Sequence, residues 1–139
     1  MSPSRLAQGD VTMPGLRKET TPVTIESPDY LGRVVKLGDF TVAFETLRTG
    51  KDPAANFRDL PDGRCPCPHW GVVVKGRWTA RYSDHEETFE AGDVFYSPPG
   101  HLPLADPGTE LITFSPTAEL EQVNAALAKN MALSRDTKS

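Results

Sequence analysis

The chain has 139 residues, of which 37% are hydrophobic, and it carries a formal net charge of −4. This length suffices for one domain with a single core, and no apolar run approaches the length needed to cross a bilayer. Basic and acidic residues are interspersed, so the sequence predicts no surface for nucleic acid and no membrane association. The first residues lack the pattern of a secretion signal, and a cytoplasmic location is expected.

The chain begins with a polar stretch, residues 1–21, in which proline and glycine interrupt any pattern, and this stretch is predicted to be a flexible arm. Residues 22–116 hold short apolar or alternating segments separated by Gly, Pro, Asp and Ser, which predicts strands joined by turns. The predicted strands are residues 22–26, 33–37, 40–47, 68–75, 77–82, 86–90, 94–97, 102–105 and 110–114. The longest connection, residues 49–64, has Phe57 and Leu60 as its only large apolar anchors.

The hydrophobic period changes to a helical one after the last predicted strand. Ser115 is expected to cap a helix and Pro116 to occupy its first position, so residues 117–139 are predicted to form a C-terminal helix and tail. The apolar stripe of this helix is Leu120, Val123, Leu127 and Met131. We expect it to pack on the strands or on a partner.

The groups best suited to bind a metal or move a proton are gathered between Gly63 and His101. In an extended chain side chains alternate between faces, so Cys65, Cys67 and His69 are expected to point to one side as a row of possible ligands. The separation of the two cysteines on one strand face is near the upper limit for an unstrained disulfide. A reduced pair, free or metal-bound, is therefore predicted.

The second half of this region resembles the second sequence motif of the cupin family. Gly92, Pro98 and Gly100 match its Gly-x5-Pro-x-Gly pattern. The family's histidine would follow three residues after Gly100, where this chain has Pro103. The nearest histidine is His101, and the two-residue offset keeps it on the same face of an extended segment.

The first cupin motif departs further from the family pattern. Counted back from Gly76, which is expected to turn a hairpin, the family's glutamate position is His69, its second histidine is Cys65 and its first is Gly63. The opposite register, counted forward from Gly63, leaves two ligand positions to a glycine and a lysine. The resemblance implies an all-β fold, a cupin-type jelly-roll antiparallel β-barrel over residues 22–116, and often a homodimer.

The resemblance also implies a divalent metal ion in the barrel. The candidate ligands are Cys65, Cys67, His69 and His101, and thiolate with imidazole favours zinc over iron or nickel. The missing acidic residue argues against the two-histidine, one-carboxylate site of iron oxygenases, although Glu110 could supply an oxygen. Alternatively, the cysteines simply fill space in the core and no metal binds.

Function follows from the same residues. With a bound metal, His69 and His101 would serve a reaction on a small-molecule substrate, with lyase, isomerase, cyclase, hydrolytic and oxygenase-type chemistry left open. Without a metal, His69 could act as a general base, with Tyr82 or Tyr96 as a hydrogen-bond donor. The third alternative is a small-molecule-binding protein without catalytic activity.

Overall fold

The computed structural model describes the backbone of residues 15–138 and the side chains of residues 15–126 and 129. Most of the predicted arm, residues 1–14, lies outside the described residues. Of its remainder, Lys18–Thr20 forms a 3₁₀ turn. Thr21 is buried and its hydroxyl donates a hydrogen bond of 2.7 Å to the carbonyl of Arg17.

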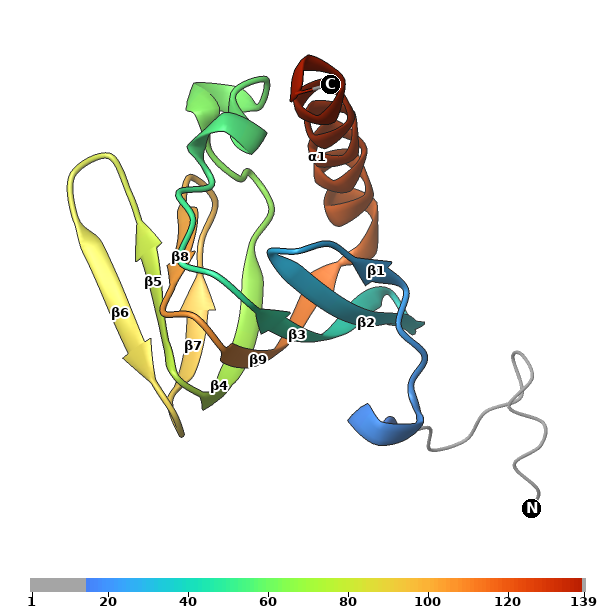
Figure 1. Ribbon diagram of the computed structural model, residues 1–139. Coiled ribbons are helices and arrows are strands. Elements are labelled where there is room, and N and C mark those ends of the chain that lie inside the picture. Colours follow the sequence, from blue (N-terminus) through green and yellow to red (C-terminus); the bar gives the residue numbers. More distant parts are fainter. Residues whose placement is uncertain (1–14, 139) are drawn as a thin grey trace.

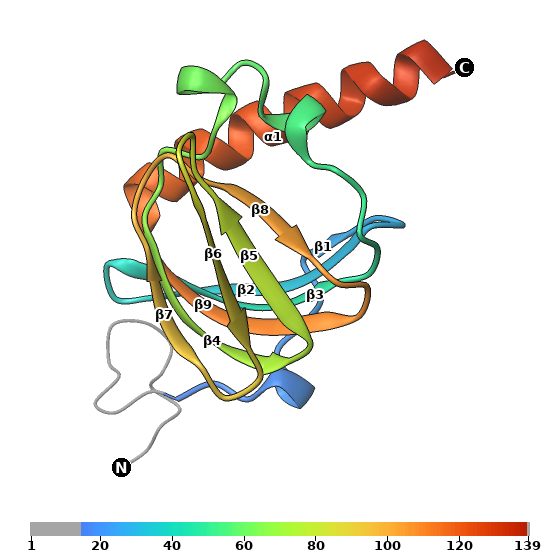
Figure 2. The same cartoon turned by 90° about the vertical axis from the view of Figure 1, so that its left-hand side faces the viewer.

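Two antiparallel sheets face each other and form the barrel (Figures 1 and 2). The larger sheet has the order β1-β2-β3-β9-β4-β7 and the smaller has the order β6-β5-β8. The strands are β1 (Ile25–Glu26), β2 (Tyr30–Leu37), β3 (Phe40–Leu47), β4 (His69–Lys75), β5 (Arg77–Arg81), β6 (Glu86–Glu90), β7 (Val94–Ser97), β8 (Leu102–Ala105) and β9 (Thr109–Pro116). The predicted all-β, jelly-roll class is confirmed.

Gly76 does not turn a hairpin, which corrects one prediction. β4 pairs with β7 and β9, whereas β5 pairs with β6 and β8, so at Gly76 the chain crosses from one sheet to the other. Gly76 has a φ of +85°, and a Cβ there would lie 2.4 Å from Oγ1 of Thr109. Only glycine fits this crossing without displacing β9.

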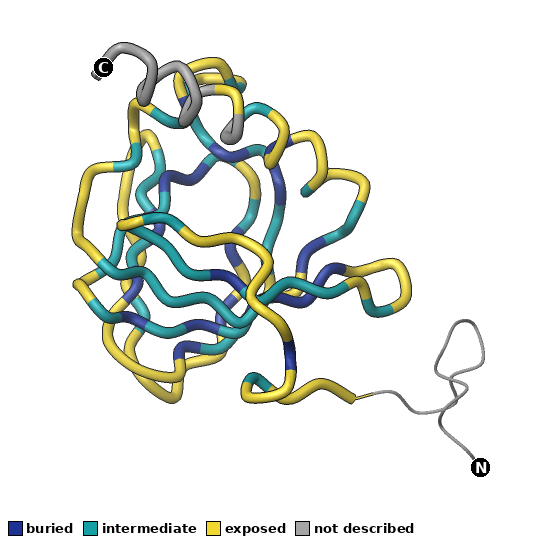
Figure 3. The backbone as a smooth tube through the Cα atoms, turned by 45° about the vertical axis from the view of Figure 1, so that its right-hand side comes forward, coloured by how far each residue is buried: buried dark blue, intermediate teal, exposed yellow. Residues whose placement is uncertain are grey.

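The core has two parts, and Figure 3 shows the buried segments along the strands and the exposed turns around them. Between the sheets, Trp78 stacks on Phe95 with ring centroids 4.6 Å apart. A second cluster joins the outer side of the smaller sheet to the loop before β4. Phe57 and Leu60 anchor that loop as predicted, packing near Cys65 and Leu102.

The C-terminal helix α1 (Thr117–Lys138) lies at the end of the barrel that also holds the 3₁₀ turns Ala54–Phe57 and Pro61–Gly63 (Figures 1 and 2). Val123 is buried against that loop, and Leu120 packs beside it. The side chains of Leu127 and Met131 lie outside the described residues. The predicted cap was wrong: β9 continues through Ser115 and Pro116, because the Ser115 hydroxyl bonds a histidine inside the barrel.

The outer face of the larger sheet carries a cluster of exposed aromatic residues. The register places Phe40 of β3, Phe114 of β9, Trp70 of β4 and Tyr96 of β7 on this face, and each is 39–49% exposed. The ring centroids of Trp70 and Tyr96 are 4.9 Å apart, and those of Phe40 and Trp70 are 5.9 Å apart. Because side chains alternate along β4, Trp70 points away from His69.

No helix in the described part of the chain is long and apolar enough to cross a membrane.

Candidate metal centre

Three side chains bring possible metal ligands together inside the barrel. One ligand atom each from Cys65, His69 and His101 lies within 4.8 Å of the others. His69 is the first residue of β4 in the larger sheet, and His101 directly precedes β8 in the smaller sheet. Cys65 is tied to His101 by a backbone bridge, in which its N–H donates to the His101 carbonyl at 2.8 Å. The cluster therefore joins the two sheets.

Cys67 does not join this cluster. The predicted row assumed an extended strand from residue 65 onward, but the chain bends at Cys67 and β4 begins only at His69. The break removes the two-residue alternation that would have aligned the three side chains. The Cys67 thiol donates to the carbonyl of Pro68 at 3.4 Å and is fully buried.

Hydrogen bonds fix which nitrogen of His101 is available. Its Nδ1 lies 2.9 Å from the carbonyl of Pro98 and 3.0 Å from the hydroxyl of Ser97. A carbonyl only accepts, so Nδ1 carries the proton and donates it. The lone pair of Nε2 is thereby left for a metal.

His69 is oriented by a hydroxyl from the neighbouring strand. Its Nδ1 lies 2.7 Å from Oγ of Ser115, which the β9 register places directly beside it. Its Nε2 lies 3.6 Å from Sγ of Cys65. Both histidines thus present Nε2 to the cluster and have Nδ1 held by the protein, which is the usual arrangement around a bound metal.

Burial keeps these groups uncharged when no metal is present. It lowers the pKa of His69 to about 3, with a further contribution from nearby His101, and it lowers the pKa of His101 as well. Burial raises the pKa of Cys65 to about 11, and the charge of Glu45 adds to this effect. Burial also raises the pKa of Cys67 to about 12. Neutral imidazole is the metal-binding form, whereas Cys65 would release its proton on binding.

One donor distance matches that expected around a tetrahedral ion. With Zn–S near 2.3 Å and Zn–N near 2.0–2.1 Å, sulfur and nitrogen on one zinc lie about 3.6 Å apart. The distance between Cys65 Sγ and His69 Nε2 is 3.6 Å, and all three ligand atoms lie within 4.8 Å of one another. A set of three protein ligands would leave a fourth position for water or substrate, as in catalytic zinc sites.

The other candidate residues lie elsewhere. Glu110 pairs with Lys18 at 3.2 Å and is outside the cluster. Tyr96 is on the outer face of the larger sheet, so it does not face His69. Tyr82 contacts the two groups that hold His101. Its hydroxyl lies 3.1 Å from Ser97 Oγ and donates to the Pro98 carbonyl at 3.3 Å.

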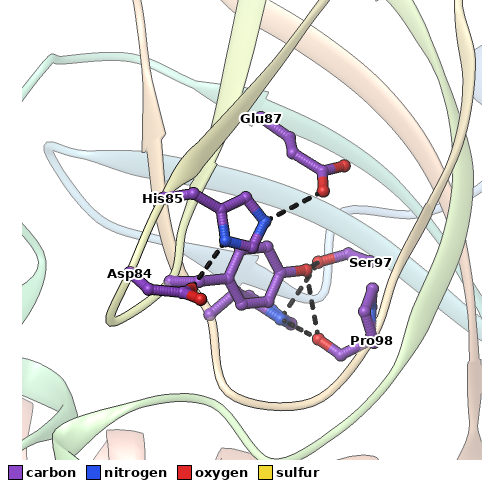
Figure 4. A network of polar contacts seen from close by, with 7 residues as sticks. Asp84, His85, Glu87, Ser97 and Pro98 are labelled. Atoms are coloured by element: carbon purple, nitrogen blue, oxygen red, sulfur yellow. Dashed lines mark hydrogen bonds and ion pairs between the residues drawn. The ribbon is translucent and has the colours of Figure 1, made fainter.

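The remaining histidine, His85, belongs to a different network at the turn between β5 and β6. Figure 4 shows its ring between the carboxylates of Asp84 and Glu87, at 2.7 and 3.0 Å. The hydrogen bonds to these carboxylates raise the pKa of His85. Its ring stacks on Tyr82 with centroids 4.9 Å apart. An open cavity of about 610 Å³ is lined by this turn and by Arg64, but not by the three cluster residues.

Sequence reasoning missed the groups that surround the cluster. Ser97 and Ser115 are almost fully buried and hold the two histidines, and Thr113 and Glu45 form a further polar pair at 2.6 Å between the sheets. A signal was present, because three of the four inward positions of β9 carry hydroxyl residues, which are Thr109, Thr113 and Ser115. Hydroxyls at inward positions of a barrel strand indicate partners within the barrel.

Comparisons with known proteins agree on the fold. No family model matches the chain, and no curated protein matches it. Among solved structures, a protein of unknown function from Rhizobium leguminosarum matches with a TM-score of 0.56 at 14% identity, over 76% of this chain and 96% of the other. An RmlC-like cupin from Shewanella frigidimarina matches with a TM-score of 0.53 at 19% identity, over 76% and 92%.

A third solved structure is HppE in an iron(II) form. It matches with a TM-score of 0.51 at 12% identity, over 72% of this chain and 58% of the other. Sequence identities of 12–19% support a shared fold and nothing further. The chain has the cupin fold, which confirms what the Gly92 motif predicted.

Proposed function

We propose that the protein is a metal-dependent enzyme acting on a small molecule, with one divalent cation held by Cys65, His69 and His101. The observation that carries this proposal is the convergence of three ligand atoms within 4.8 Å from segments of both sheets. The same two histidines have Nδ1 occupied by buried partners. Packing alone does not require such a pre-oriented set.

A divalent ion at this position supplies a Lewis acid that polarises a carbonyl or lowers the pKa of water. The protein's own groups prepare the site. Ser115 and the Pro98 carbonyl hold the histidine rings in place, and Trp78, with centroids 6.3 Å from His101, excludes water on one side. One open ligand position suits a lyase, isomerase, cyclase or hydrolytic step.

Zinc is favoured over iron or nickel because the third ligand is a thiol. The iron(II) form of HppE supports a divalent metal within this fold. In this chain, however, no carboxylate joins His69 and His101 within the described cluster. A set of one sulfur and two imidazole nitrogens suits zinc better than the carboxylate-containing site of iron oxygenases.

One observation favours a second candidate, a metal-free protein that binds a small molecule without catalysis. Cys65 is 3% exposed, and its neutral thiol already contacts Nε2 of His69 at 3.6 Å. A thiol and an imidazole can satisfy each other in this way. The protein would then bind its ligand through polar contacts and shape alone.

Elemental mass spectrometry separates the two candidates. The protein is purified without an affinity tag or chelator, together with Cys65→Ser, His69→Ala and, as a matched control, His85→Ala. We expect about one zinc per chain in the parent and control, and loss of metal in the first two variants. A parent without metal, even after reconstitution, would overturn the leading proposal and leave the metal-free candidate.

We also infer a homodimer formed through the outer face of the larger sheet. Phe40, Trp70, Tyr96 and Phe114 lie together there. Glu110, which β9 contributes to the same face four positions from Phe114, is paired with Lys18 at 3.2 Å. An exposed aromatic cluster of this kind is typical of an interface, and a paired charge beside it gives little like-charge repulsion between two copies. Sedimentation equilibrium should show a dimer that Trp70→Ser disrupts; a monomeric parent would contradict this inference.

A further inference from the structure

A half-buried carboxyl group faces the same barrel interior as the candidate metal centre. Glu45 lies on β3, and the register pairs it with Leu111 of β9 and Gly32 of β2. Ala43, two residues before Glu45 on β3, pairs with Thr113 of β9. Two residues after Thr113 on the same strand is Ser115, whose hydroxyl bonds His69. Glu45 and His69 therefore project from one face of one sheet.

Two hydroxyl groups hold this carboxyl in a defined orientation. Tyr30 donates to Oε1 at 3.0 Å, and Thr113 donates to Oε2 at 2.6 Å. The Tyr30 ring reaches Glu45 by crossing Gly32, where a Cβ would lie 2.8 Å from the ring. The missing side chain at Gly32 therefore makes the contact between Tyr30 and Glu45 possible. Residues of β2 and β9 thus hold the carboxyl group that β3 contributes.

Part of the hydrogen-bonding capacity of the carboxyl group remains unused. A carboxylate has about four acceptor sites, and the two donors fill only two of them. Among the described residues, no lysine, arginine or histidine forms an ion pair with Glu45. Burial raises its pKa, which reflects the cost of an unpaired charge at this depth.

Glu45 is also accessible and close enough to matter at the cluster. It is half-buried although it points between the sheets, so solvent, and hence a ligand, reaches part of it. Thr113, which bonds the carboxyl group, and Ser115, which bonds His69, occupy successive inward positions of β9. The carboxyl group and the cluster are therefore neighbours on one face of the sheet, within the reach of a small molecule, and the charge of Glu45 also contributes to the raised pKa of Cys65.

We propose that Glu45, held by Tyr30 and Thr113, is a second binding subsite that takes the ammonium group of a small molecule whose other end lies at Cys65, His69 and His101. An ammonium group supplies enough donors for the two free acceptor sites, and its positive charge pairs with the carboxylate. A hydroxyl group supplies one donor and leaves the charge unpaired. The substrate class is thus a compact organic amine with a metal-binding group, such as an ω-amino carboxylate. This inference rests on the proposed function for the end that binds metal.

The test uses probes that sample the span between the two places. Zinc-loaded protein is titrated by calorimetry with glycine, β-alanine, 4-aminobutyrate and 5-aminovalerate, and with the matched carboxylates that lack the amine. We expect at least one amine probe to bind about tenfold more tightly than its counterpart. Glu45→Gln should abolish this preference with zinc content unchanged, whereas the exposed Glu90→Gln should retain it. No preference in the parent, or a preference that survives Glu45→Gln, would overturn the proposal.

A second variant and a metal-free measurement test the subsite if Glu45→Gln does not fold or if no zinc binds. If Glu45→Gln does not fold, Glu45→Asp retains the charge but shortens the side chain, and should shift the preferred probe to one methylene longer; an unchanged optimum would count against the subsite. If the parent holds no zinc, the proposed function fails. The subsite is then tested with propylamine and butylamine on metal-free protein, where binding lost in Glu45→Gln supports it and equal binding contradicts it.

Discussion

Two histidine networks lie on either side of the Tyr82 ring and have opposite electrostatics. His69 and His101 are enclosed by hydroxyl and carbonyl groups between the sheets, and burial lowers the pKa of both. His85 is exposed between two carboxylates, which raise its pKa. A histidine near a cupin motif is therefore not by itself a ligand. The neutral, pre-oriented rings are suited to a metal, whereas the ring between carboxylates holds its proton more strongly than a free imidazole does.

The largest expected difference is in the pH dependence of stability. In metal-free protein, His69 keeps a pKa of about 3, whereas in the unfolded chain it titrates near 6.5. Because the unfolded state takes up this proton first, the free energy of unfolding should fall as the pH drops from 6.5 toward 3, by up to about 1.4 kcal/mol per pH unit. Urea unfolding in the presence of chelator measures this slope. His69→Gln should flatten it, and an unchanged slope would contradict the buried neutral ring.

His85→Gln should change the same measurement with the opposite sign. Because its pKa is raised in the folded protein, the stabilisation from this ring is present below pH 6.5 and is lost as the pH rises through the folded pKa. The variant should therefore lose stability mainly at acidic pH. A variant that loses stability equally at all pH values would show that His85 acts by packing on Tyr82 alone.

The buried hydroxyls should matter next. Ser115→Ala leaves the three ligands in place but releases Nδ1 of His69, whereas Ser97→Ala leaves Nδ1 of His101 bonded to the Pro98 carbonyl. We expect Ser115→Ala to weaken zinc binding about 10- to 100-fold in chelator competition, Ser97→Ala to weaken it less, and exposed Ser83→Ala to leave it unchanged. Equal affinities in all four proteins would indicate that the rings are held by packing.

The smallest effect should come from Tyr82, which contacts both networks. Its ring stacks on His85 and its hydroxyl lies beside Ser97 and Pro98. Tyr82→Phe keeps the stacking and removes the hydrogen bonds, so we expect a loss of about 1 kcal/mol in unfolding free energy. Zinc affinity should change less than in Ser97→Ala. Tyr96→Phe on the outer face is the matched control.

The fold was largely predictable because its signals are local. Strand alternation and the Gly92 to Gly100 spacing depend on neighbouring residues, and both led to the cupin barrel. Pairing was less predictable, since nothing near Gly76 reveals that β4 and β5 enter different sheets. The helix cap failed for a similar reason, because the partner of Ser115 is a histidine 46 positions away.

The site was predictable only in part. Cys65, His69 and His101 were identified by residue type and motif position, and the structure brings their ligand atoms together. Cys67 was grouped with them by strand periodicity, which the bend before β4 interrupts. Glu45 was not identified as a site residue, because its contacts with Thr113 and Tyr30 depend on packing across strands and on the missing side chain at Gly32. These are properties of packing across strands and are absent from a local pattern.

Zinc K-edge X-ray absorption on protein purified without chelator tests the metal centre of Cys65, His69 and His101 directly, because it counts the ligands of the ion. We expect one sulfur near 2.3 Å, together with nitrogen or oxygen ligands near 2.0–2.1 Å. Cys65→Ser should remove the sulfur contribution, and Cys67→Ser should leave it unchanged. Two sulfur ligands, or none, would contradict the assignment of Cys65, His69 and His101 as the metal centre.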